Sequence, residues 1–422
     1  MAASSLRPVQ LKLVSFLGLV SFIALAWACS YNRKRFPWRT VLTGLGLQVV
    51  FALFILHTSA GVALFQGAQG AFLSLINAAE KGAGMVFGPL ANKPLLGEKL
   101  GPGNAFIFVI TVSATIIVVS AISSLLYHYG ILQRVVRGVA WVMRRVMGTS
   151  GSESLSAAAN IFMGQTEAPL VIKPYLPRMT QSELMAMMVG GMATIAGGVL
   201  AAYVSFNINA GHLLTASVMN APAALLMAKI LKPETEVSET AAGAPAEVPR
   251  DTTNGLEAMC RGAGEGIMLA INVMAMLIAF VAVVALLNSL LGWGQGWFGV
   301  TNPMRLETFF GWINAPFAWL LGVPVKDCVA VGEILGQRVV LNEFIGYLAL
   351  GEKMPSLDPR SITLTTYALC GFANFSSIAI QIGGIGALAP ERRGDLARLG
   401  LKAMLGGLLA CYLTAALIGI LT

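Results

Sequence analysis

Charged residues are scarce in this sequence. Of its 422 residues, 11% are charged and 56% are hydrophobic, whereas soluble domains carry about 25% charged residues. This shortage excludes an ordinary soluble enzyme. Apolar stretches of about the 20 residues that a transmembrane helix needs recur along nearly the whole chain. The composition therefore predicts a polytopic membrane protein. Loop topology and anionic lipid headgroups explain its net charge of +8 better than binding to nucleic acid does.

Motifs of enzyme chemistry are also lacking. The sequence has no HExxH, GxSxG or GxxxxGKS/T string, no CxxC pair, and no cysteine with a histidine at metal-ligand spacing. The sequence thus lacks the residues that zinc enzymes, serine hydrolases and nucleotide-hydrolysing enzymes usually require. We predict that the protein is not an enzyme. The isolated residues are Cys29, Cys260, Cys328, Cys370, Cys411, His57, His128 and His212.

Eight apolar stretches are long enough to cross a membrane. The first is longer than a signal-peptide core and is followed by Arg33, Lys34 and Arg35, so we interpret it as a retained helix. If that basic connection is cytoplasmic, 18 of the 28 lysines and arginines fall on the cytoplasmic side, as the positive-inside rule requires, and both termini lie outside. The stretches cover residues 9–30, 40–65, 104–129, 184–206, 211–231, 265–291, 361–387 and 397–421.

Three further segments are neither spans nor simple loops. Residues 131–147 place four arginines against an apolar face, which predicts a helix along the cytoplasmic surface or a basic cap on the preceding helix. Residues 303–322 are typical of an external amphipathic helix. Residues 233–255 are polar and rich in Glu, Ala, Thr and Pro, which indicates a linker between two halves.

Two segments, 150–177 and 326–350, are predicted to be re-entrant hairpins of opposite orientation. Each begins and ends on one side by the charge count, has a polar middle, and precedes a helix interrupted by Gly or polar residues. Backbone of this kind is tolerated at membrane depth only where protein or a water-filled cavity surrounds it. The repetition is typical of transporters built from inverted repeats, with the binding site between the repeats. Chance similarity among apolar segments is the alternative.

Glu167 and Glu343 lie in the middle of these hairpins. Placing a carboxylate at the centre of a membrane helix costs about 2.5–3.5 kcal/mol of insertion free energy. Such a group therefore usually has a binding partner or a functional role. The alternative to a binding role is that Glu343 pairs with Arg338 and holds the hairpins together. Glu333, nearer the start of its segment, is interpreted as an interfacial residue.

Uncharged hydrogen-bonding residues accompany the two carboxylates in corresponding pieces of both halves. With few buried basic residues, amides, hydroxyls and carboxylates favour a polyhydroxylated solute over a phosphate or dicarboxylate. Carbonyls exposed where a helix unwinds could also hold a cation. The residues are Asn160, Gln165, Thr166, Thr194, Asn374, Ser376 and Ser377.

Three motifs resemble signatures of the concentrative nucleoside transporter family, and the resemblance covers nearly the whole chain. They are GQTEAPL at 164–170, GQRVVLNEFIGY at 336–347 and GFANFSSIAIQIGG at 371–384. The second motif departs from the family pattern G-x-K-x-x-x-N-E-F-V-A-aromatic at Arg338, Ile345 and Gly346, but it retains the Asn-Glu-Phe core at 342–344.

The resemblance implies a role for each matching residue. Those expected beside the nucleobase are Gln165, Thr166, Glu167 and Val199. Those expected at the ribose are Glu343, Asn374 and Ser377, with Phe372 packed against the ligand. The coupling sodium ion would be held by Asn160 and Thr194 and by the carbonyls of Met163 and Ile195.

The resemblance also implies the architecture. It predicts an all-α homotrimer in the bacterial inner membrane, in which a transport domain carries substrate past a scaffold in an elevator-like movement. The expected segments are 1–130 (scaffold helices one to three with an interfacial segment), 131–232 (first repeat of the transport domain), 233–255 (linker), 256–325 (scaffold helix six and external helix) and 326–422 (second repeat).

The function so predicted is sodium-coupled import of nucleosides such as uridine and adenosine. Selectivity is expected to be broad, because Gly164 and Gln165 resemble those of broadly selective relatives. Proton coupling, another polyhydroxylated solute, and a channel are the alternatives. An intramembrane enzyme that used Glu167 and Glu343 as acid and base would lack a nucleophile, a metal motif and a cofactor string.

Overall fold

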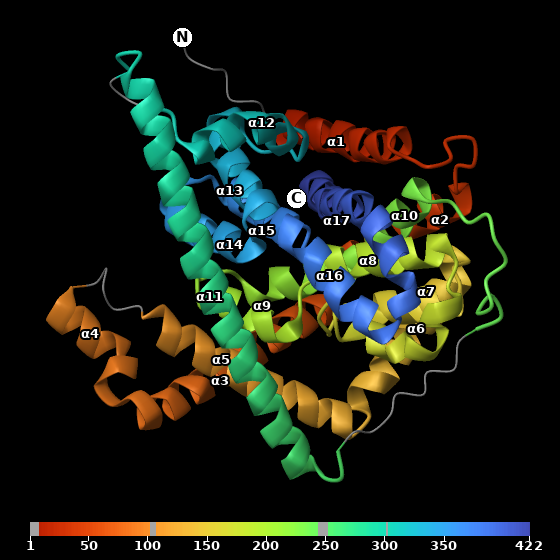
Figure 1. Ribbon diagram of the computed structural model, residues 1–422, viewed down its shortest axis with the longest axis horizontal. Coiled ribbons are helices and arrows are strands. Elements are labelled where there is room, and N and C mark those ends of the chain that lie inside the picture. The colour runs from red at the N-terminus through yellow and green to blue at the C-terminus, as the bar shows by residue number, and fades with distance from the viewer. Residues whose placement is uncertain (1–7, 102–106, 244–251, 301–302) are drawn as a thin grey trace.

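The computed structural model describes residues 8–101, 107–243, 252–300 and 303–422, and its regular structure in these ranges is helical, as predicted (Figure 1). The α-helices are α1 (Pro8–Ala28), α2 (Trp38–His57), α3 (Ser59–Phe87), α4 (Lys93–Leu100), α5 (Phe108–His128), α6 (Ile131–Met147), α7 (Gly151–Ala159), α8 (Gln181–Ala193), α9 (Gly197–Val204), α10 (Ala210–Leu231), α11 (Gly255–Gly296), α12 (Leu306–Leu320), α13 (Cys328–Val340), α14 (Glu343–Lys353), α15 (Pro359–Leu369), α16 (Phe375–Leu388) and α17 (Arg393–Leu421). The 3-10 helices are η1 (Gly88–Ala91), η3 (Ala168–Arg178), η4 (Val325–Asp327), η5 (Met354–Ser356) and η6 (Pro390–Arg392).

Within the described residues, eight helices are long and apolar enough to cross a membrane, which is the predicted number but not the predicted set. The predicted span 40–65 is wrong in its second half. Thr58 is extended there, and its side chain accepts a hydrogen bond from Gly61 N at 2.9 Å, which ends α2 and starts α3. The segment Ser59–Lys99 is a candidate span that the sequence analysis missed. The predicted span 361–387 is divided between α15 and α16.

Helices stand where the sequence predicts surface helices. The segment 131–147 is α6, whose buried side includes Val136, Met143 and Met147, while Arg134 and Arg137 are exposed. The segment 303–322 contains α12, which packs along α13. Both are therefore ordered parts of the fold.

Two structural units share one plan, a helical hairpin followed by a broken helix. In the first unit, α7 and η3 pack together as the hairpin, and α8 and α9 are separated by residues 194–196. In the second, α13 and α14 form the hairpin, and α15 and α16 are separated by residues 370–374. Each unit is followed by a long helix, α10 or α17, and these two helices pack against each other.

Local sequence explains where the first unit begins and turns. Ser150 and Glu153 form a capping box at the start of α7, and Thr180 and Glu183 form another at the start of α8. Each box satisfies two backbone N–H groups that a helix start leaves unpaired. These hydrogen bonds fix the hairpin base at 150 and the helix entry at 180.

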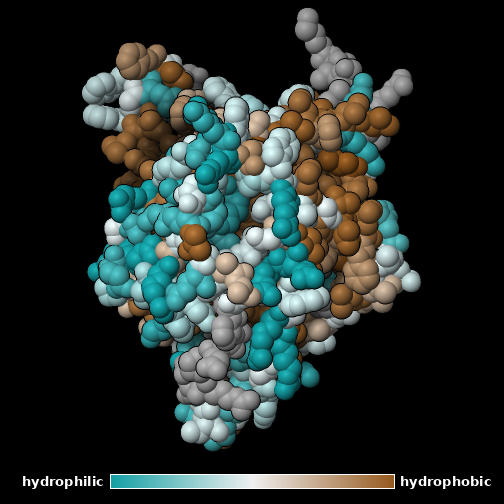
Figure 2. Space-filling model, turned by 90° about the vertical axis from the view of Figure 1, so that its right-hand side faces the viewer, coloured by the Kyte–Doolittle hydropathy of each residue, from teal (hydrophilic) through white to brown (hydrophobic). Residues whose placement is uncertain are grey.

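Burial separates a core from an outer layer. The α8–α9 pair, α10 and α17 are mostly buried, whereas α3 and α11 are mostly exposed. Along α11 large apolar side chains such as Ile278, Leu286 and Leu290 face outward. Figure 2 shows hydrophobic atoms gathered along one side of the molecule beside a hydrophilic area. Such an apolar surface suits contact with lipid or with another protein surface.

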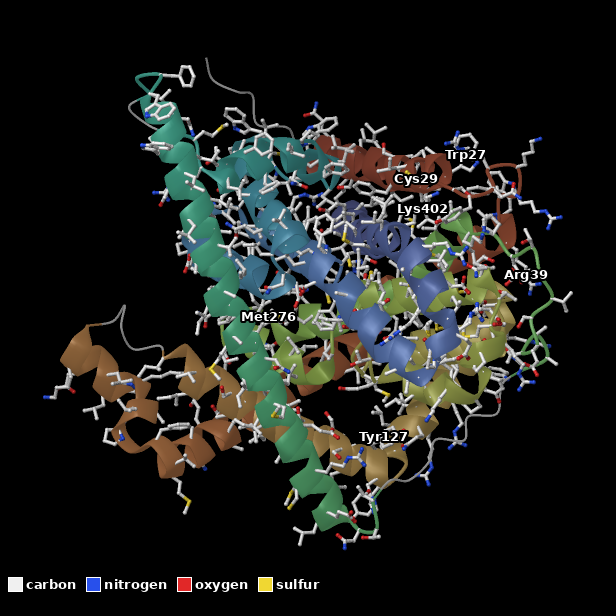
Figure 3. The ribbon with its side chains drawn as sticks, in the orientation of Figure 1. Trp27, Cys29, Arg39, Tyr127, Met276 and Lys402 are labelled. Carbon is white, nitrogen blue, oxygen red and sulfur yellow. The ribbon has the colours of Figure 1, made fainter. Side chains whose placement is uncertain are left out.

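Helices α1 and α2 pack on the inner helices of the two units. Helix α1 lies along α17, and α2 lies along α10. Figure 3 shows Lys402 of α17 below Cys29, the residue that follows α1, in this view. The Lys402 ammonium lies 3.6 Å from the centre of the Tyr31 ring, and Tyr31 N donates to Leu231 O at 2.8 Å. The first two helices thus contact the units that carry the hairpins, whereas α3 and α11 pack on α5.

Candidate functional site

The second hairpin holds its carboxylate at a helix start. Asn342 caps α14 by accepting from Ile345 N at 3.0 Å, and Glu343 follows as the first helical residue. Glu343 is buried, at 7% exposure. Its two oxygens accept hydrogen bonds from different elements, Oε1 from the Tyr203 hydroxyl at 3.1 Å and Oε2 from Asn374 Nδ2 at 2.9 Å. The carboxylate is therefore oriented by neutral donors.

The break in the second broken helix supplies the neighbouring polar groups. Asn374 caps α16, because its Oδ1 accepts from Ser377 N at 2.9 Å and from the Ser376 hydroxyl at 2.6 Å. The same side chain thus starts a helix and binds Glu343. Phe372, half-buried, precedes it in a turn in which Asn374 N donates to Phe372 O at 2.9 Å.

The tip of the first hairpin reaches this cluster. Gln165 Nε2 donates to the Ser377 hydroxyl at 3.1 Å, and Gln165 Oε1 accepts from Gln381 Nε2 at 3.2 Å. The structure therefore joins Glu343, Asn374, Ser377 and Gln165 in one continuous set of contacts. These four residues were predicted to share a site although up to 212 positions separate them.

The other residues predicted at the nucleobase lie in two environments. Val199, in the first turn of α9, is 4% exposed. Thr166 is half-buried against α16, where a Cβ on Gly384 would lie 2.8 Å from Thr166 Cγ2. Glu167 is exposed, and its Oε2 accepts from Gly164 N at 3.1 Å within its own turn. Glu167 therefore belongs to the tip but is not part of the buried set around Glu343.

The predicted sodium ligands lie where the first hairpin tip meets the first helix break. Gly197 N donates to Phe162 O at 3.3 Å, which joins the two segments. Asn160 is 1% exposed and donates through Nδ2 to Ser156 O, while its buried Oδ1 has no partner among the described residues. The Thr194 hydroxyl donates to Gly190 O, which leaves its oxygen lone pairs available. Oxygen acceptors of this kind fit a hard cation.

Two long-range residues stabilise the helix breaks. Asn220 of α10 donates through Nδ2 to Ala193 O at 2.8 Å and to Cys370 O at 2.6 Å. Helix ends leave carbonyls without partners. The Asn220 amide thus satisfies one such carbonyl in each of the two units. Arg338 donates to Ala368 O at 2.5 Å and to Gly371 O at 3.2 Å. No ion pair joins Arg338 to Glu343 in the described part of the chain, so the structure does not support the alternative in which these two residues pair.

Two further glutamates form ion pairs at the bases of the hairpins. Glu333 forms an ion pair with Lys353 across the second hairpin. Glu153 forms a buried ion pair with Lys229 of α10 below the first hairpin. Sequence reasoning missed the second pair, because Lys229 lies at the end of an apolar span and resembles an ordinary basic flank.

Sequence reasoning also missed Tyr203 and Gln381. Tyr203 is fully buried on α9 and stacks on Tyr347, with ring centres 4.2 Å apart. Its only local signal is an aromatic hydroxyl in a segment of small apolar residues. Gln381 is fully buried on α16, within the GFANFSSIAIQIGG motif, but no spacing rule singled it out.

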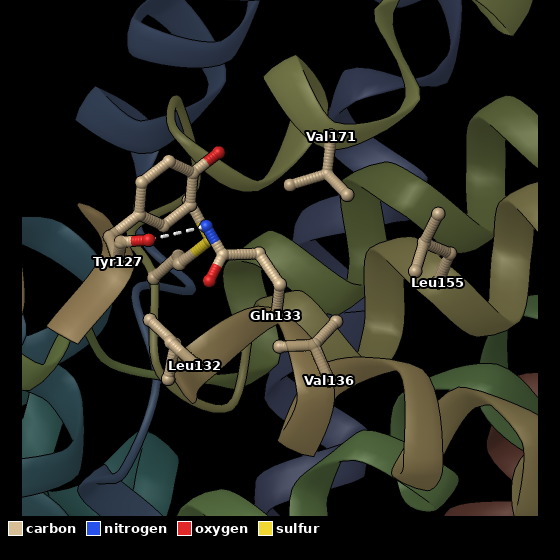
Figure 4. A pocket seen from close by; sticks show the side chains of 7 residues that line it. Tyr127, Leu132, Gln133, Val136, Leu155 and Val171 are labelled. Carbon is tan, nitrogen blue, oxygen red and sulfur yellow. Dashed lines mark hydrogen bonds between the residues drawn. The ribbon is translucent and has the colours of Figure 1, made fainter. Parts of the chain in front are cut away.

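A small cavity lies beside the first hairpin and not at the polar cluster (Figure 4). Its walls are apolar apart from the Gln133 amide and the Tyr127 hydroxyl, and they include the side chain of Met163. Gln133 donates to Tyr127 O at 2.7 Å. This cavity is thus separate from the contacts around Glu343. Its lining residues are Tyr127, Leu132, Gln133, Val136, Leu155, Met163 and Val171.

Comparison with protein families gives three matches that together cover most of the chain. Residues 17–90 match the family described as Na+ dependent nucleoside transporter N-terminus, and residues 212–419 match the corresponding C-terminus. Residues 109–208 match the family described as nucleoside recognition.

Known proteins resemble the chain over nearly its whole length. An uncharacterized transporter of Haemophilus influenzae is 44% identical over 97% of both chains, and the uncharacterized transporter YutK of Bacillus subtilis is 42% identical over 96% of this chain and 98% of its own. The sodium/nucleoside cotransporter 1 of Rattus norvegicus is 40% identical over 98% of this chain, which spans 64% of that protein. The solved structure of CNTnw in an inward-facing substrate-bound state has a TM-score of 0.91 at 38% identity, with 97% of both chains covered.

Proposed function

The chain belongs to the concentrative, Na+-dependent nucleoside transporter family, and on that premise we propose that it imports nucleosides together with sodium. It is a multi-pass membrane transporter and not an enzyme. We assign it to the bacterial inner membrane with both termini outside. Uridine and adenosine represent the pyrimidine and purine nucleosides that we expect it to accept.

The observation that carries this proposal is the buried Glu343 carboxylate. Tyr203 and Asn374 hold it with neutral donors, and it forms no ion pair among the described residues. Each carboxylate oxygen has further acceptor capacity. Ribose hydroxyls are strong donors to such an acceptor, and hydrogen bonds to charged groups contribute about 1.5–3 kcal/mol. We therefore assign Glu343, Asn374 and Ser377 to the ribose, with Phe372 against the ligand.

The first unit would bind the other two components. We assign Gln165, Thr166, Glu167 and Val199 to the nucleobase, since the Gln165 amide touches the ribose residue Ser377. We assign sodium to Asn160, Thr194 and the carbonyls of Met163 and Ile195. The buried and unpartnered Oδ1 of Asn160 supports this assignment, because a cation would satisfy it.

Alternating access would move both units as one body. Solved structures of CNTnw in inward-facing and outward-facing states support such a cycle for the family. We propose the division that the resemblance implies, with residues 1–130 and 256–325 as the scaffold and the two hairpin units as the moving part. The contacts of α1 with α17 and of α2 with α10 would then lie between the two parts. We propose an elevator-like movement and a homotrimer, for which exposed apolar α11 offers surface.

Sodium is the coupling ion that the sequence favours. One sodium ion moving down about 100 mV releases about 2.3 kcal/mol, and a tenfold gradient adds about 1.4 kcal/mol. Together these terms support an accumulation of a few hundred-fold. Proton coupling is the competing mode.

Purified protein in liposomes tests the function directly. Labelled uridine and adenosine should accumulate unmodified against their gradients when external sodium is present, and choline replacement should abolish accumulation at neutral pH. Accumulation driven by a proton gradient alone would overturn sodium coupling. Equilibration without accumulation would indicate a channel, and failure with every nucleoside would overturn the substrate class.

A further inference from the structure

Gln381 occupies the junction of three elements. It projects from α16, is fully buried, and donates through Nε2 to Met188 O of α8 at 3.1 Å and to Gln165 Oε1 of the first hairpin tip at 3.2 Å. Gly191 permits this approach, because a Cβ there would lie 2.8 Å from Gln381 Nε2. The contact thus links the second unit to both parts of the first.

The Met188 carbonyl determines which way round the Gln381 amide is held. A carbonyl oxygen only accepts hydrogen bonds, so the NH2 group of Gln381 must face it. The same NH2 group reaches Gln165, which must then present its oxygen there. Gln165 consequently turns its own NH2 group toward the Ser377 hydroxyl, 3.1 Å away.

This direction of donation continues to the proposed substrate residues. Since the Ser377 oxygen accepts a bond from Gln165, the Ser377 hydroxyl proton remains available to another acceptor. Gln165 also retains a second N–H. The Oε1 atom of Gln381 has no partner among the described residues, so only the donor half of this amide takes part in the chain of bonds.

We propose that Gln381 is a positioning residue that fixes the Gln165 amide and the Ser377 hydroxyl as donors, and so selects nucleosides that present acceptor atoms to them. This inference rests on the proposed function. The favoured class is a nucleoside with a ring carbonyl or ring nitrogen facing Gln165 and a sugar oxygen facing Ser377. Gln381 does not itself touch the substrate.

Two substitutions at position 381 distinguish loss of the two donated hydrogen bonds from reversal of their direction. Gln381→Met keeps the length of the side chain and removes both donated bonds, whereas Gln381→Glu presents oxygens to two acceptors and favours a reversed Gln165 amide. Gln48→Met is the matched control, because Gln48 is a fully buried helical glutamine outside the site. All three are assayed in proteoliposomes with sodium.

We expect Gln381→Met to raise the uridine KM about tenfold, the effect of about one hydrogen bond, with maximal rate within twofold. Uridine and cytidine carry an acceptor and a donor, respectively, at the same ring position. Gln381→Glu should therefore change the ratio of their kcat/KM values at least threefold, while Gln48→Met leaves it unchanged. A ratio unchanged in both Gln381 variants would overturn the inference.

A double variant tests whether Gln381 acts through Gln165. In a Gln165→Ala background, adding Gln381→Met should change the uridine KM less than twofold relative to Gln165→Ala alone. A further tenfold rise in this KM would contradict the inference. If Gln381→Met does not reach the membrane, Gln381→Glu alone tests the inference through the uridine-to-cytidine ratio. Absence of nucleoside uptake by the unaltered chain would instead overturn the proposed function, and this inference with it.

Discussion

The two hairpin units share a plan but hold their carboxylates differently. In the second unit Glu343 is buried, and both of its oxygens are bound by side chains of other elements, Tyr203 and Asn374. In the first unit Glu167 is exposed and binds a backbone N–H of its own turn. The buried acid is oriented by tertiary structure, whereas the exposed one shapes a local turn. A repeat in sequence therefore does not imply a repeat in function.

The asparagine oxygens near the two hairpin tips also differ in whether they have a hydrogen-bond partner. Asn342 uses its side-chain oxygen to cap α14, while Asn160 in the first unit leaves a buried oxygen without a partner in the described structure. The Asn342 acceptor is thus satisfied by its own helix, and Glu343 beside it suits recognition of a neutral polyol. The Asn160 acceptor of the first unit remains open and suits a cation. The following substitutions test this division.

Glu343→Gln should give the largest loss. The new amide would turn an NH2 group toward Tyr203 or Asn374, both donors, and would remove the charged acceptor proposed for ribose. We expect initial uridine uptake in proteoliposomes to fall at least 100-fold with normal membrane expression. Uptake within threefold of the unaltered protein would refute the ribose assignment.

Asn160→Ala should weaken sodium binding more than uridine binding. It removes the open Oδ1 acceptor, and we expect the sodium concentration for half-maximal uptake to rise at least tenfold. The uridine KM at saturating sodium should change less than threefold. Asn314→Ala is the control, because Asn314 also donates to the carbonyl four residues earlier but lies on α12. Equal losses in both parameters would contradict the separation of the two sites.

Tyr203→Phe should have an intermediate effect. It keeps the stacking on Tyr347 but removes one donor to Glu343, and we expect the uridine KM to rise about tenfold. The control is Tyr412→Phe, since the buried Tyr412 hydroxyl has no hydrogen-bond partner among the described residues. Radiolabelled uridine kinetics measure both. If the two variants behave alike, Tyr203 does not orient Glu343.

Glu167→Gln should have the smallest effect. An exposed amide oxygen can still accept from Gly164 N, so the turn should persist, and we expect a change in uridine KM of about threefold. Competition by adenosine measures whether the change concerns the base. A loss as large as that of Glu343→Gln would show that the difference in burial does not separate the two acids.

Much of this organisation could be predicted from local sequence. Long apolar stretches identified the membrane class, and Gly and polar residues within them indicated the interrupted helices, because Gly weakens a helix interior. The split at Thr58 was missed, since hydropathy does not change there while a single Thr ends one helix and caps the next. The alternative pairing of Arg338 with Glu343 does not occur in the described structure, because Arg338 instead donates to carbonyls that the broken helix leaves unpaired.

The sequence by itself determined the helical membrane class, the two hairpins and most of the residues around Glu343, because these depend on hydrophobicity, helix capping and short motifs. Only the tertiary structure decided which groups orient them. Tyr203 meets Glu343 across 140 positions, Gln381 meets Gln165 across 216, and Asn220 binds both helix breaks. Such contacts depend on how several helices pack, and a buried amide or hydroxyl binds whichever partner that packing provides.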